Sequence, residues 1–295
     1  ARVYVRQMGA PIVVKADGLA AGKGVVVAQT VDEALDAITS MLEDKTFGEA
    51  GARVVMEEFL EGEEASVLAF TDGETIKAMI PSQDHKCIYD GDKGPNTGGM
   101  GTYAPAPVVT PEVMERVQKE VLDPMIAGMK NEGKPYVGCL YAGLMITKNG
   151  PKVIEFNCRF GDPETQVVLP LLESDLLTVM QATTNGNLGD VEVKFSDKNA
   201  CCVIMASEGY PLSYEKGFEI TIPYGVLPNV YVAGAKVYKQ SLLTNGGRVL
   251  GVTAIGDTLP EAIEKSYGMV SEIHFDNAFY RRDIGARAMK AWEEK

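Results

Sequence analysis

The sequence is poor in histidine and cysteine, the residues that most often build zinc sites and disulfide frameworks. Its two histidines, His85 and His274, lie far apart, so a histidine-based zinc site is disfavoured. The five cysteines form no C-x-x-C pair and no even-numbered set. This pattern is typical of reduced thiols, and it predicts a cytoplasmic protein.

Positive charge and long apolar runs are also scarce. The 28 basic residues face 41 acidic ones, which gives a net charge of −13 at pH 7. Such an acidic chain is poorly suited to coat nucleic acid or an anionic membrane surface. No apolar run approaches the roughly 18 residues of a membrane-spanning helix. We therefore expect neither a nucleic acid nor a membrane among its partners.

Two familiar phosphate-binding motifs are absent, although residues 15–25 form a glycine-rich loop, KADGLAAGKGV. A P-loop needs one more residue between its first glycine and the Gly-Lys pair, and Gly24 stands where its hydroxyl residue should be. The G-x-G-x-x-G pattern of dinucleotide-binding folds fails as well. Apolar β-branched runs at 11–14 and 25–28 flank the loop and predict a hairpin. Its glycine amides can cradle phosphate, and the alternative is an ordinary hairpin without a ligand.

The 295 residues, 45% of them hydrophobic, provide material for two or three compact units. Residues 1–64 predict a β–loop–β–α–β unit, in which Thr30 and Glu33 form a capping box for the helix. Asn-Gly pairs at 149–150 and 245–246 predict hairpin turns. The expected helices span 31–44, 110–130, 165–183 and 258–273. The later strands are expected at 53–60, 65–71, 75–80, 139–148 and 150–157, and near 200–206, 218–222, 230–238 and 247–255.

Two acidic stretches can carry chemistry. Glu155 and Asn157 stand two residues apart on a predicted strand, so both side chains leave the same face. A carboxylate beside an amide oxygen suits Mg²⁺, which keeps water and substrate phosphates as its other ligands, and the alternative is a solvated strand face. Earlier, residues 57–60 end a strand whose backbone groups can pair with an adenine edge, and Glu64 can accept both hydroxyls of a ribose. The alternative there is a charged turn.

The chain carries, in order, a strand that ends near Lys15, the glycine-rich loop and the two acidic stretches. This order resembles the ATP-grasp superfamily, in which two α+β lobes hold ATP between them. Longer stretches look like the phosphoribosylamine–glycine ligase family, and they continue through TNGGRVLGVTA and YRRDIG near the end. The others are APIVVKADGLAAGKGVVVA, EEFLEGEEAS, SQDHK, GPNTGGMG, LYAGLMI and VIEFNCRFGDPETQ.

The resemblance implies an α+β, ATP-grasp fold followed by a small β-rich C-terminal domain. Its small lobe would span residues 1–64, its central lobe 65–196 and the C-terminal domain 197–295. Family members carry a further N-terminal domain of about a hundred residues, the size of one small domain. Nothing in this sequence matches that domain, and we expect the missing domain to pack on the central lobe.

The resemblance also implies a nucleotide site. Lys15 would reach the α- and β-phosphates, while Gly22, Lys23 and Gly24 close over the γ-phosphate. Glu155 and Asn157 would bind Mg²⁺ or Mn²⁺, and the strand before them, CLYAGLMIT, lacks the third acidic ligand of many ATP-grasp enzymes. The adenine and ribose would be held by Glu57, Glu58, Phe59, Leu60 and Glu64.

The substrate site is expected around Arg159 and a long glycine-rich loop, since loops of that length are rarely inert. Arg159 could bind the glycine carboxylate or an acyl phosphate, and would be catalytic together with Lys15 and Lys23. The alternative is a salt bridge from Arg159 to Asp162 or Glu164. The other expected substrate-binding residues are Pro81, Asp84, His85, Lys86, Asn96, Thr97, Gly98 and Gly99. Those from Asp84 onward are candidates for the ribose phosphate and the amine, and the amides of 97–99 would form an anion nest.

The family joins glycine to 5-phosphoribosylamine in purine biosynthesis, while ATP becomes ADP and phosphate. The resemblance therefore predicts an ATP-dependent carboxylate–amine ligase that works through an acyl phosphate. One alternative is another ATP-grasp ligase with a different carboxylate or amine. A second is a nucleotide-binding module without turnover.

Overall fold

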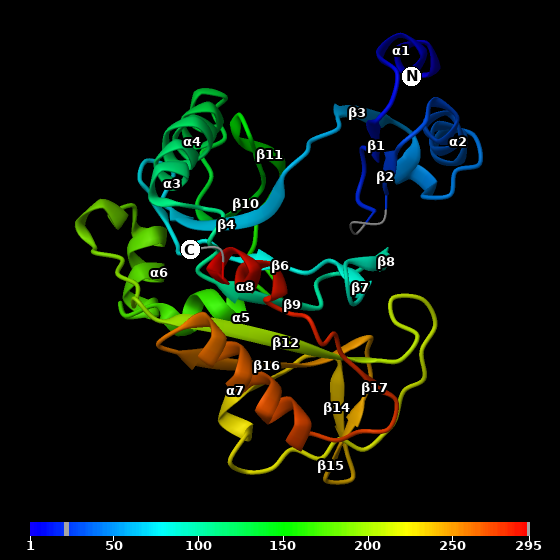
Figure 1. Cartoon of the computed structure of the whole chain (residues 1–295). Coiled ribbons are helices and arrows are strands. Elements are labelled where there is room, and N and C mark those ends of the chain that lie inside the picture. Colours follow the sequence, from blue (N-terminus) through cyan, green and yellow to red (C-terminus); the bar gives the residue numbers. More distant parts are fainter. Residues whose placement is uncertain (21–23, 294–295) are drawn as a thin grey trace. The chain divides into compact units, whose positions relative to one another are not determined.

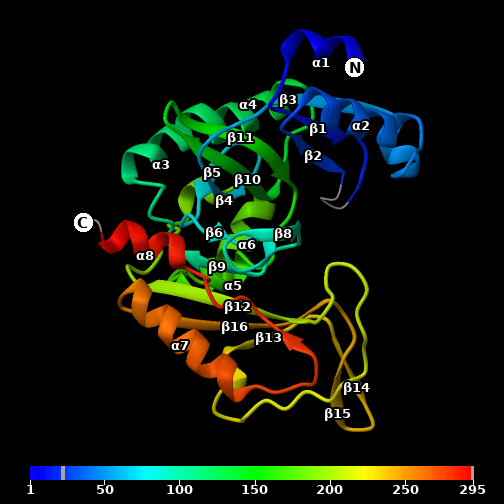
Figure 2. The same cartoon turned by 45° about the vertical axis from the view of Figure 1, so that its right-hand side comes forward.

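The computed structural model describes residues 1–20 and 24–293, and the chain divides into two compact units, Ala1–Glu61 and Gly62–Lys295 (Figures 1 and 2). Both units combine helices with antiparallel sheets, so the expected α+β class is confirmed. The domain boundaries expected at 64 and 196 stay predictions. In the described part of the chain, none of the helices has the length and apolar character needed to cross a bilayer.

The N-terminal unit is a three-stranded sheet with one face covered by helices. Its strand order is β2 (Val25–Ala28), β1 (Ile12–Ala16) and β3 (Val54–Glu58). Helix α2 is capped as predicted, because Thr30 Oγ1 accepts from the Glu33 amide at 3.2 Å and the Glu33 carboxylate accepts from the Gln29 amide at 2.7 Å. The helical segments are α1 (Arg2–Met8), α2 (Val31–Leu42) and the 3₁₀ turn η1 (Gly48–Gly51).

The predicted glycine hairpin is confirmed, since β1 and β2 pair antiparallel and the Ala16 amide donates to the Gly24 carbonyl at 2.8 Å. Gly22 and Lys23 lie outside the described residues. A side chain at Gly24 would place its Cβ 2.8 Å from that of Ala20 and 2.9 Å from that of Ala16. Glycine at this position is therefore required by close packing, whether or not a phosphate binds.

The second unit begins with a four-stranded sheet packed between helices on both faces. Its order is β11 (Gly150–Asn157), β10 (Gly138–Thr147), β4 (Glu63–Thr71) and β5 (Ile76–Ala78). Val67, Leu140 and Ala142 lie in one core, with α3 (Pro111–Val117), the π segment η2 (Gln118–Leu122) and α4 (Asp123–Asn131). Leu68, Phe70 and Tyr141 lie in another, with α5 (Thr165–Val168), η3 (Leu169–Leu171), α6 (Leu176–Asn185) and η4 (Leu188–Asp190).

A six-stranded sheet joins the middle of the chain to its C-terminal part. Ala104 of β9 pairs with Ala200 of β12, so strands from both sides of residue 196 share this sheet. Helix α7 (Leu259–Glu272) lies along it, and η5 (Leu227–Asn229) precedes its edge strand (Figure 1). The sheet contains β13 (Val230–Val232), β16 (Arg248–Gly256), β12 (Asn199–Ser207), β9 (Gly101–Ala104), β6 (Gln83–Asp84) and β17 (Ala278–Phe279). Outside it lie the hairpins β7 (Cys87–Tyr89) with β8 (Lys93–Asn96) and β14 (Ala235–Tyr238) with β15 (Ser241–Thr244), and helix α8 (Ala286–Glu293).

One of the two hairpin predictions is right. The β10–β11 turn forms at Lys148–Asn149, with Gly150 at φ 111° opening the returning strand. The hairpin predicted at 245–246 is wrong, because β16 pairs with β12 and β13 and not with β15. The turn of that region falls instead at Lys239–Gln240, where both residues have positive φ.

Four predicted elements are corrected by the structure. The helix expected at 165–183 is broken, because Pro170 lies in the 3₁₀ turn, Leu172 is extended and Asp175 caps a new helix. The run at 218–222 forms isolated bridges only, and the run at 230–238 divides into β13 and β14. The helix expected at 110–130 forms with its predicted Thr110 cap, but a π turn interrupts it just before Pro124.

Candidate active site

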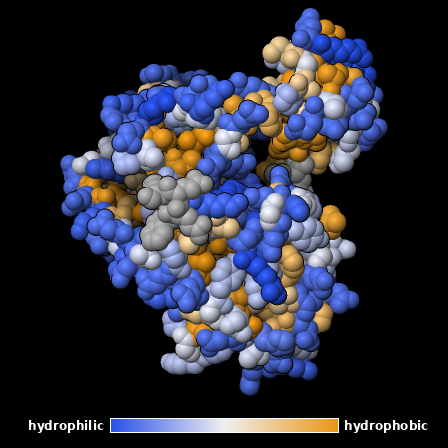
Figure 3. All heavy atoms as spheres, viewed as in Figure 1, coloured by the Kyte–Doolittle hydropathy of each residue, from blue (hydrophilic) through white to orange (hydrophobic). Residues whose placement is uncertain are grey.

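The face of the N-terminal sheet that its helices leave uncovered carries an apolar stripe and a lysine. The register places Val13 opposite Val27, and Lys15 opposite Val25 and Val55. Val25, Val27 and Val55 are 40%, 48% and 40% exposed. Figure 3 shows apolar residues reaching the surface in this unit among hydrophilic ones. Such a face can hold a flat apolar group, with an anion placed at Lys15.

Lys15 is fixed on this face by a carboxylate. Its Nζ lies 2.6 Å from Glu57 Oε2, across the β1–β3 pair. Glu57, expected at the adenine, therefore also orients the lysine expected at the phosphates. Glu58 is exposed at the end of β3, and Phe59 and Leu60 follow it half-buried. Their adenine-binding role stays a prediction.

The expected metal pair lies on the second unit's first sheet. Glu155 and Asn157 face Gly143 and Tyr141 across β10–β11, and the Asn157 amide donates to Glu155 Oε1 at 2.9 Å. This bond uses the nitrogen of the amide and leaves its oxygen available. Two oxygen donors beside a glycine that lacks a side chain fit Mg²⁺. Among the described residues no group of three His, Cys, Asp or Glu could hold a metal, so other ligands would have to come from substrate and water.

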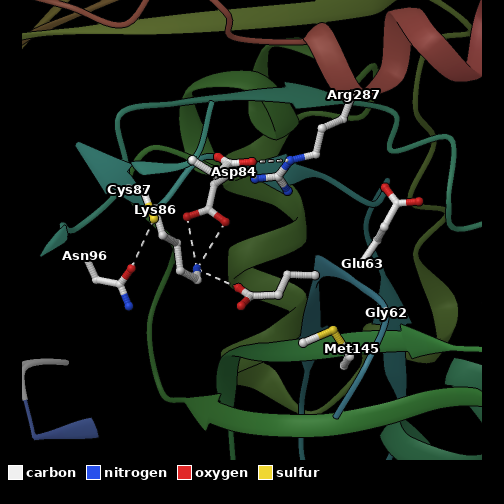
Figure 4. Close-up of a pocket in the computed structure, with 10 residues that line it drawn as sticks. Gly62, Glu63, Asp84, Lys86, Cys87, Asn96, Met145 and Arg287 are labelled. Carbon is white, nitrogen blue, oxygen red and sulfur yellow. Dashed lines mark hydrogen bonds and ion pairs between the residues drawn. The ribbon is translucent and has the colours of Figure 1, made fainter. Parts of the chain in front are cut away.

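A cavity of about 380 Å³ lies beside this sheet, with Lys86 on its wall (Figure 4). Lys86 Nζ lies 3.1 and 3.0 Å from the two oxygens of Asp84, and 3.7 Å from Glu64 Oε2. Burial opposes its charge, but Asp84 and the other acidic neighbours outweigh that effect and raise the pKa of Lys86. The cavity is lined by Gly62, Glu63, Glu64, Asp84, Lys86, Cys87, Asp92, Asn96, Met145 and Arg287.

Glu64, expected at the ribose, belongs to this cluster. Burial raises the pKa of Glu64, Lys86 lowers it, and the negative charges of Asp84 and Glu155 raise it further. Glu64 is therefore electrostatically coupled to both Lys86 and the metal pair. Its hydrogen-bonding role toward a ribose stays a prediction.

A buried hydrogen-bond network lies within the same unit. Tyr141 Oη is 2.7 Å from Ser66 Oγ and donates to Glu164 Oε1 at 2.9 Å, and Ser66 Oγ lies 3.4 Å from the same oxygen. Glu164 is 3% exposed, and burial followed by the charge of Asp84 raises its pKa. The sequence suggested Glu164 only as a salt-bridge partner for Arg159. It is instead held by neutral hydroxyls.

Arg159 does not form the salt bridge that was its alternative role. Its Nη1 donates to the Phe160 carbonyl at 2.9 Å, and no carboxylate in the described part of the chain pairs with it. Asp162 pairs with Arg248 at 3.3 Å instead. The guanidinium of Arg159 thus stays available two residues from Asn157, as a substrate role requires.

The backbone amides of residues 97–99 already donate hydrogen bonds within the protein. The amide of Thr97 donates to the Lys86 carbonyl at 2.8 Å, that of Gly98 to Tyr210 Oη at 3.1 Å, and that of Gly99 to Thr97 Oγ1 at 3.0 Å. An anion nest at these amides would need these bonds to be displaced. Asn96 lines the cavity, and the Pro81 carbonyl accepts from the Ala106 amide at 2.9 Å.

His85 stands in the chain between two cavity-lining residues, Asp84 and Lys86. It is 1% exposed, its ring packs on Tyr103 at 5.9 Å between centroids, and neither ring nitrogen has a hydrogen-bond partner among the described residues. Burial, and then the charges of Arg287 and Arg281, lower the pKa of His85 to about 4. The imidazole is therefore neutral at pH 7, and its expected contact with substrate stays a prediction.

The cavity also contains residues that sequence reasoning missed. Arg287 reaches it from α8, and Asp92 and Cys87 from the β7–β8 hairpin (Figure 4). Arg287 lies just beyond the YRRDIG stretch that carried part of the resemblance, but no periodicity or spacing connects it with a loop about 195 residues earlier.

Comparison with known proteins identifies the family. The profile for the phosphoribosylglycinamide synthetase ATP-grasp (A) domain matches residues 1–165, and that for its C domain matches residues 200–287. A phosphoribosylamine–glycine ligase of Vibrio parahaemolyticus is 52% identical over 303 residues, covering 100% of this chain and 70% of the relative.

Solved structures agree with this assignment. The crystal structure of a phosphoribosylamine–glycine ligase from Thermotoga maritima superposes with a TM-score of 0.89 at 36% identity, over 96% of this chain and 71% of that one. A Hydrogenobacter thermophilus biotin carboxylase domain, in complex with MgADP and bicarbonate, superposes with a TM-score of 0.67 at 15% identity, over 95% and 60%. The expected ATP-grasp fold is thereby confirmed. The chain belongs to the phosphoribosylamine–glycine ligase family.

Proposed function

We propose that this chain ligates glycine to 5-phosphoribosylamine at the expense of ATP, giving glycinamide ribonucleotide, ADP and phosphate in purine biosynthesis. The observation that carries the proposal is the arrangement on one sheet. Gly143 of β10 stands opposite Glu155 on one side and Ser66 on the other. The metal pair and the Ser66–Tyr141–Glu164 network are therefore neighbours on this sheet. Because the chain belongs to the phosphoribosylamine–glycine ligase family, this arrangement supports the ligase reaction.

ATP would be held by the nucleotide-binding residues expected from the sequence. The valine stripe and residues 57–60 would hold the base, Glu64 the ribose, and Lys15 the phosphates with Lys23 and the glycine loop. Lys15 suits this role because Glu57 holds its ammonium on the open sheet face. Mg²⁺, or Mn²⁺ in its place, would bind at Glu155 and Asn157 and neutralise phosphate charge.

In the first step, a carboxylate oxygen of glycine attacks the γ-phosphorus, the bond to the β–γ bridging oxygen breaks, and ADP leaves with that electron pair. Arg159 would bind the glycine carboxylate and the acyl phosphate that forms, since its guanidinium carries no carboxylate partner in the described residues. Holding the two anions in contact is the main catalytic task, because charge repulsion opposes their approach.

In the second step, the amine of phosphoribosylamine attacks the acyl carbon, and phosphate leaves as the amide forms. The nitrogen gives up a proton, which the departing phosphate or a carboxylate of the cavity can accept. Asp84 suits the orientation of the amine, because it is 5% exposed and held at both oxygens by Lys86.

The five free thiols are compatible with a cytoplasmic site of action.

The decisive assay is ADP release from the purified chain, with ATP and Mg²⁺ supplied. We expect release to require both glycine and phosphoribosylamine, and mass spectrometry to find glycinamide ribonucleotide. A different amino acid in place of glycine should be inactive. ADP release that depends on another carboxylate or amine would indicate another ligase of the superfamily. Nucleotide binding without any turnover would refute an enzymatic role.

A further inference from the structure

The phosphate of phosphoribosylamine lacks a free binding group at residues 97–99, whose amides are already hydrogen-bonded, and the cavity wall offers another candidate. This inference rests on the proposed function. Of the two cations that line the cavity, Lys86 is already matched by both oxygens of Asp84 and by Glu64. A substrate anion brought to Lys86 would be repelled by these two carboxylates. The other cation, Arg287, pairs with a different carboxylate, that of Asp92.

Arg287 shares its one carboxylate with a second arginine. Its Nε and Nη2 lie 3.1 and 2.9 Å from Asp92 Oδ2, while Arg281 Nη1 donates to Asp92 Oδ1 at 3.0 Å. No hydrogen bond joins Arg287 Nη1 to an acceptor among residues 1–20 and 24–293. Asp92 thus aligns Arg287, while Asp283 pairs with Arg281, so the two guanidiniums and the two carboxylates balance in charge. Arg287 still keeps one donor nitrogen, Nη1, for an incoming anion.

Arg281 makes the arrangement rigid. Its side chain is fully buried, donates to both oxygens of Asp283 at 2.7 Å, and reaches the Cys87 carbonyl at 3.0 Å. The Gly91 amide also donates to Asp283, at 2.8 Å. The β7–β8 hairpin and the segment that begins α8 are therefore fastened together. Arg281 is in this sense a positioning residue for Arg287.

The cavity lining offers groups for both charged parts of the substrate. Asp84 and Glu64 favour an amine, and Glu64 lies on β4 two residues from Ser66, which shares a row of the sheet with Gly143 and Glu155. The amine must react near the metal pair, where the acyl phosphate forms. The glycine carboxylate also belongs at the metal pair, beside Arg159. The ribose phosphate is the anion left for Arg287.

We propose that Arg287 binds the phosphate group of 5-phosphoribosylamine, and that Arg281 holds it in place through Asp92. The phosphates of ATP and the carboxylate of glycine are the competing ligands. Steady-state kinetics can separate all three, because each substrate is varied with the other two saturating.

The variant Arg287→Met removes the cation and keeps much of the side-chain length. We expect the KM for phosphoribosylamine to rise about 10- to 100-fold, the scale of a lost hydrogen bond between charged groups. The KM values for ATP and glycine should stay within about 2-fold of wild type, and Arg287→Lys should restore part of the affinity. Arg282→Met is the matched control, because Arg282 is exposed and its guanidinium stacks 6.0 Å from the Tyr280 ring.

A binding measurement gives an independent readout. Ribose 5-phosphate and ribose are titrated calorimetrically into the wild-type chain and into the Met variant, with folding checked by circular dichroism. We expect the phosphate to improve binding to wild type and to lose that advantage in Arg287→Met. An unchanged KM for phosphoribosylamine, or an equal rise for glycine or ATP, would overturn the assignment. Wild type without glycine-dependent ADP release would refute the proposed function instead, while the calorimetric comparison would still decide whether Arg287 binds a sugar phosphate.

Discussion

Burial of His85 should make the second unit less stable as the pH falls from about 7 to 4. The imidazole is 1% exposed, both ring nitrogens lack partners among the described residues, and its pKa is lowered from 6.5 to about 4. Arg287 and Arg281 repel a proton on the ring, while Asp92 and Asp283 favour one. In the unfolded chain the same group binds a proton near pH 6.5. Between these values the unfolded state therefore holds more protons, and stability rises with pH.

The size of the effect follows from the two pKa values. A full separation from 6.5 to about 4 is worth about 3 kcal/mol at pH 4 and below, at 1.36 kcal/mol for each pKa unit. Between pH 7 and pH 5 the contribution of this one residue is about 2 kcal/mol. Tyr103, whose ring packs on His85, does not titrate in this window because burial raises its pKa.

The assay is urea unfolding of wild type and His85→Leu at pH 7 and pH 5, followed by circular dichroism. Carboxylates titrate in the same range, so the informative quantity is the difference between the two proteins. We expect wild type to lose about 2 kcal/mol more than the variant on acidification. His274→Leu is the control, since its side chain is 78% exposed, and it should lose as much as wild type. Equal losses for wild type and a folded His85→Leu would refute the reasoning.

Three further predictions test the metal pair, the buried arginine and one glycine. Asn157→Ala should lower turnover by tens to hundreds of fold at limiting Mg²⁺ and leave the unfolding midpoint nearly unchanged, since it removes a ligand oxygen and little packing. Arg281→Met should cost about 2–3 kcal/mol in urea unfolding, because two aspartates lose a buried partner. Gly51→Ala should lower the melting temperature, because its Cβ would lie 2.7 Å from the backbone carbonyl oxygen of Met41, whereas Gly128→Ala has no atom within 4 Å and should be neutral or stabilising.

The parts of the fold that follow from local chemistry could be predicted from the sequence. The β1–β2 pair forms because β-branched runs flank a glycine-rich segment, and α2 begins where a capping box stands. Glu155 and Asn157 share a face because strand geometry alternates side chains, which needs no knowledge of the partner strands. Their function as metal ligands stays a prediction, as do the other substrate and nucleotide contacts.

What depends on tertiary pairing could not be predicted. Asn245–Gly246 has the composition of a hairpin turn, but β16 gains more by entering the middle of a six-stranded sheet than by folding back on β15. A local turn preference is worth about a kcal/mol or less, and burial of a whole strand outweighs it. The predicted single helix at 165–183 failed for a related reason, since Leu172 leaves the helix and bridges to Phe195.

The same dependence on tertiary contacts explains why the sequence did not predict Arg287 as a site residue, although it did predict Lys86. Lys86 is two residues from Asp84 on an extended segment, so a pattern in the sequence already brings a charge pair together. Arg287 reaches Asp92 only because Arg281, itself fully buried, fastens the C-terminal segment to the β7–β8 hairpin. A fully buried guanidinium is costly unless carboxylates surround it, so Asp92 and Asp283 are needed by the fold before any substrate arrives. The arginine facing the cavity is thus held by a structural requirement, and it is available for substrate because its Nη1 has no acceptor among the described residues.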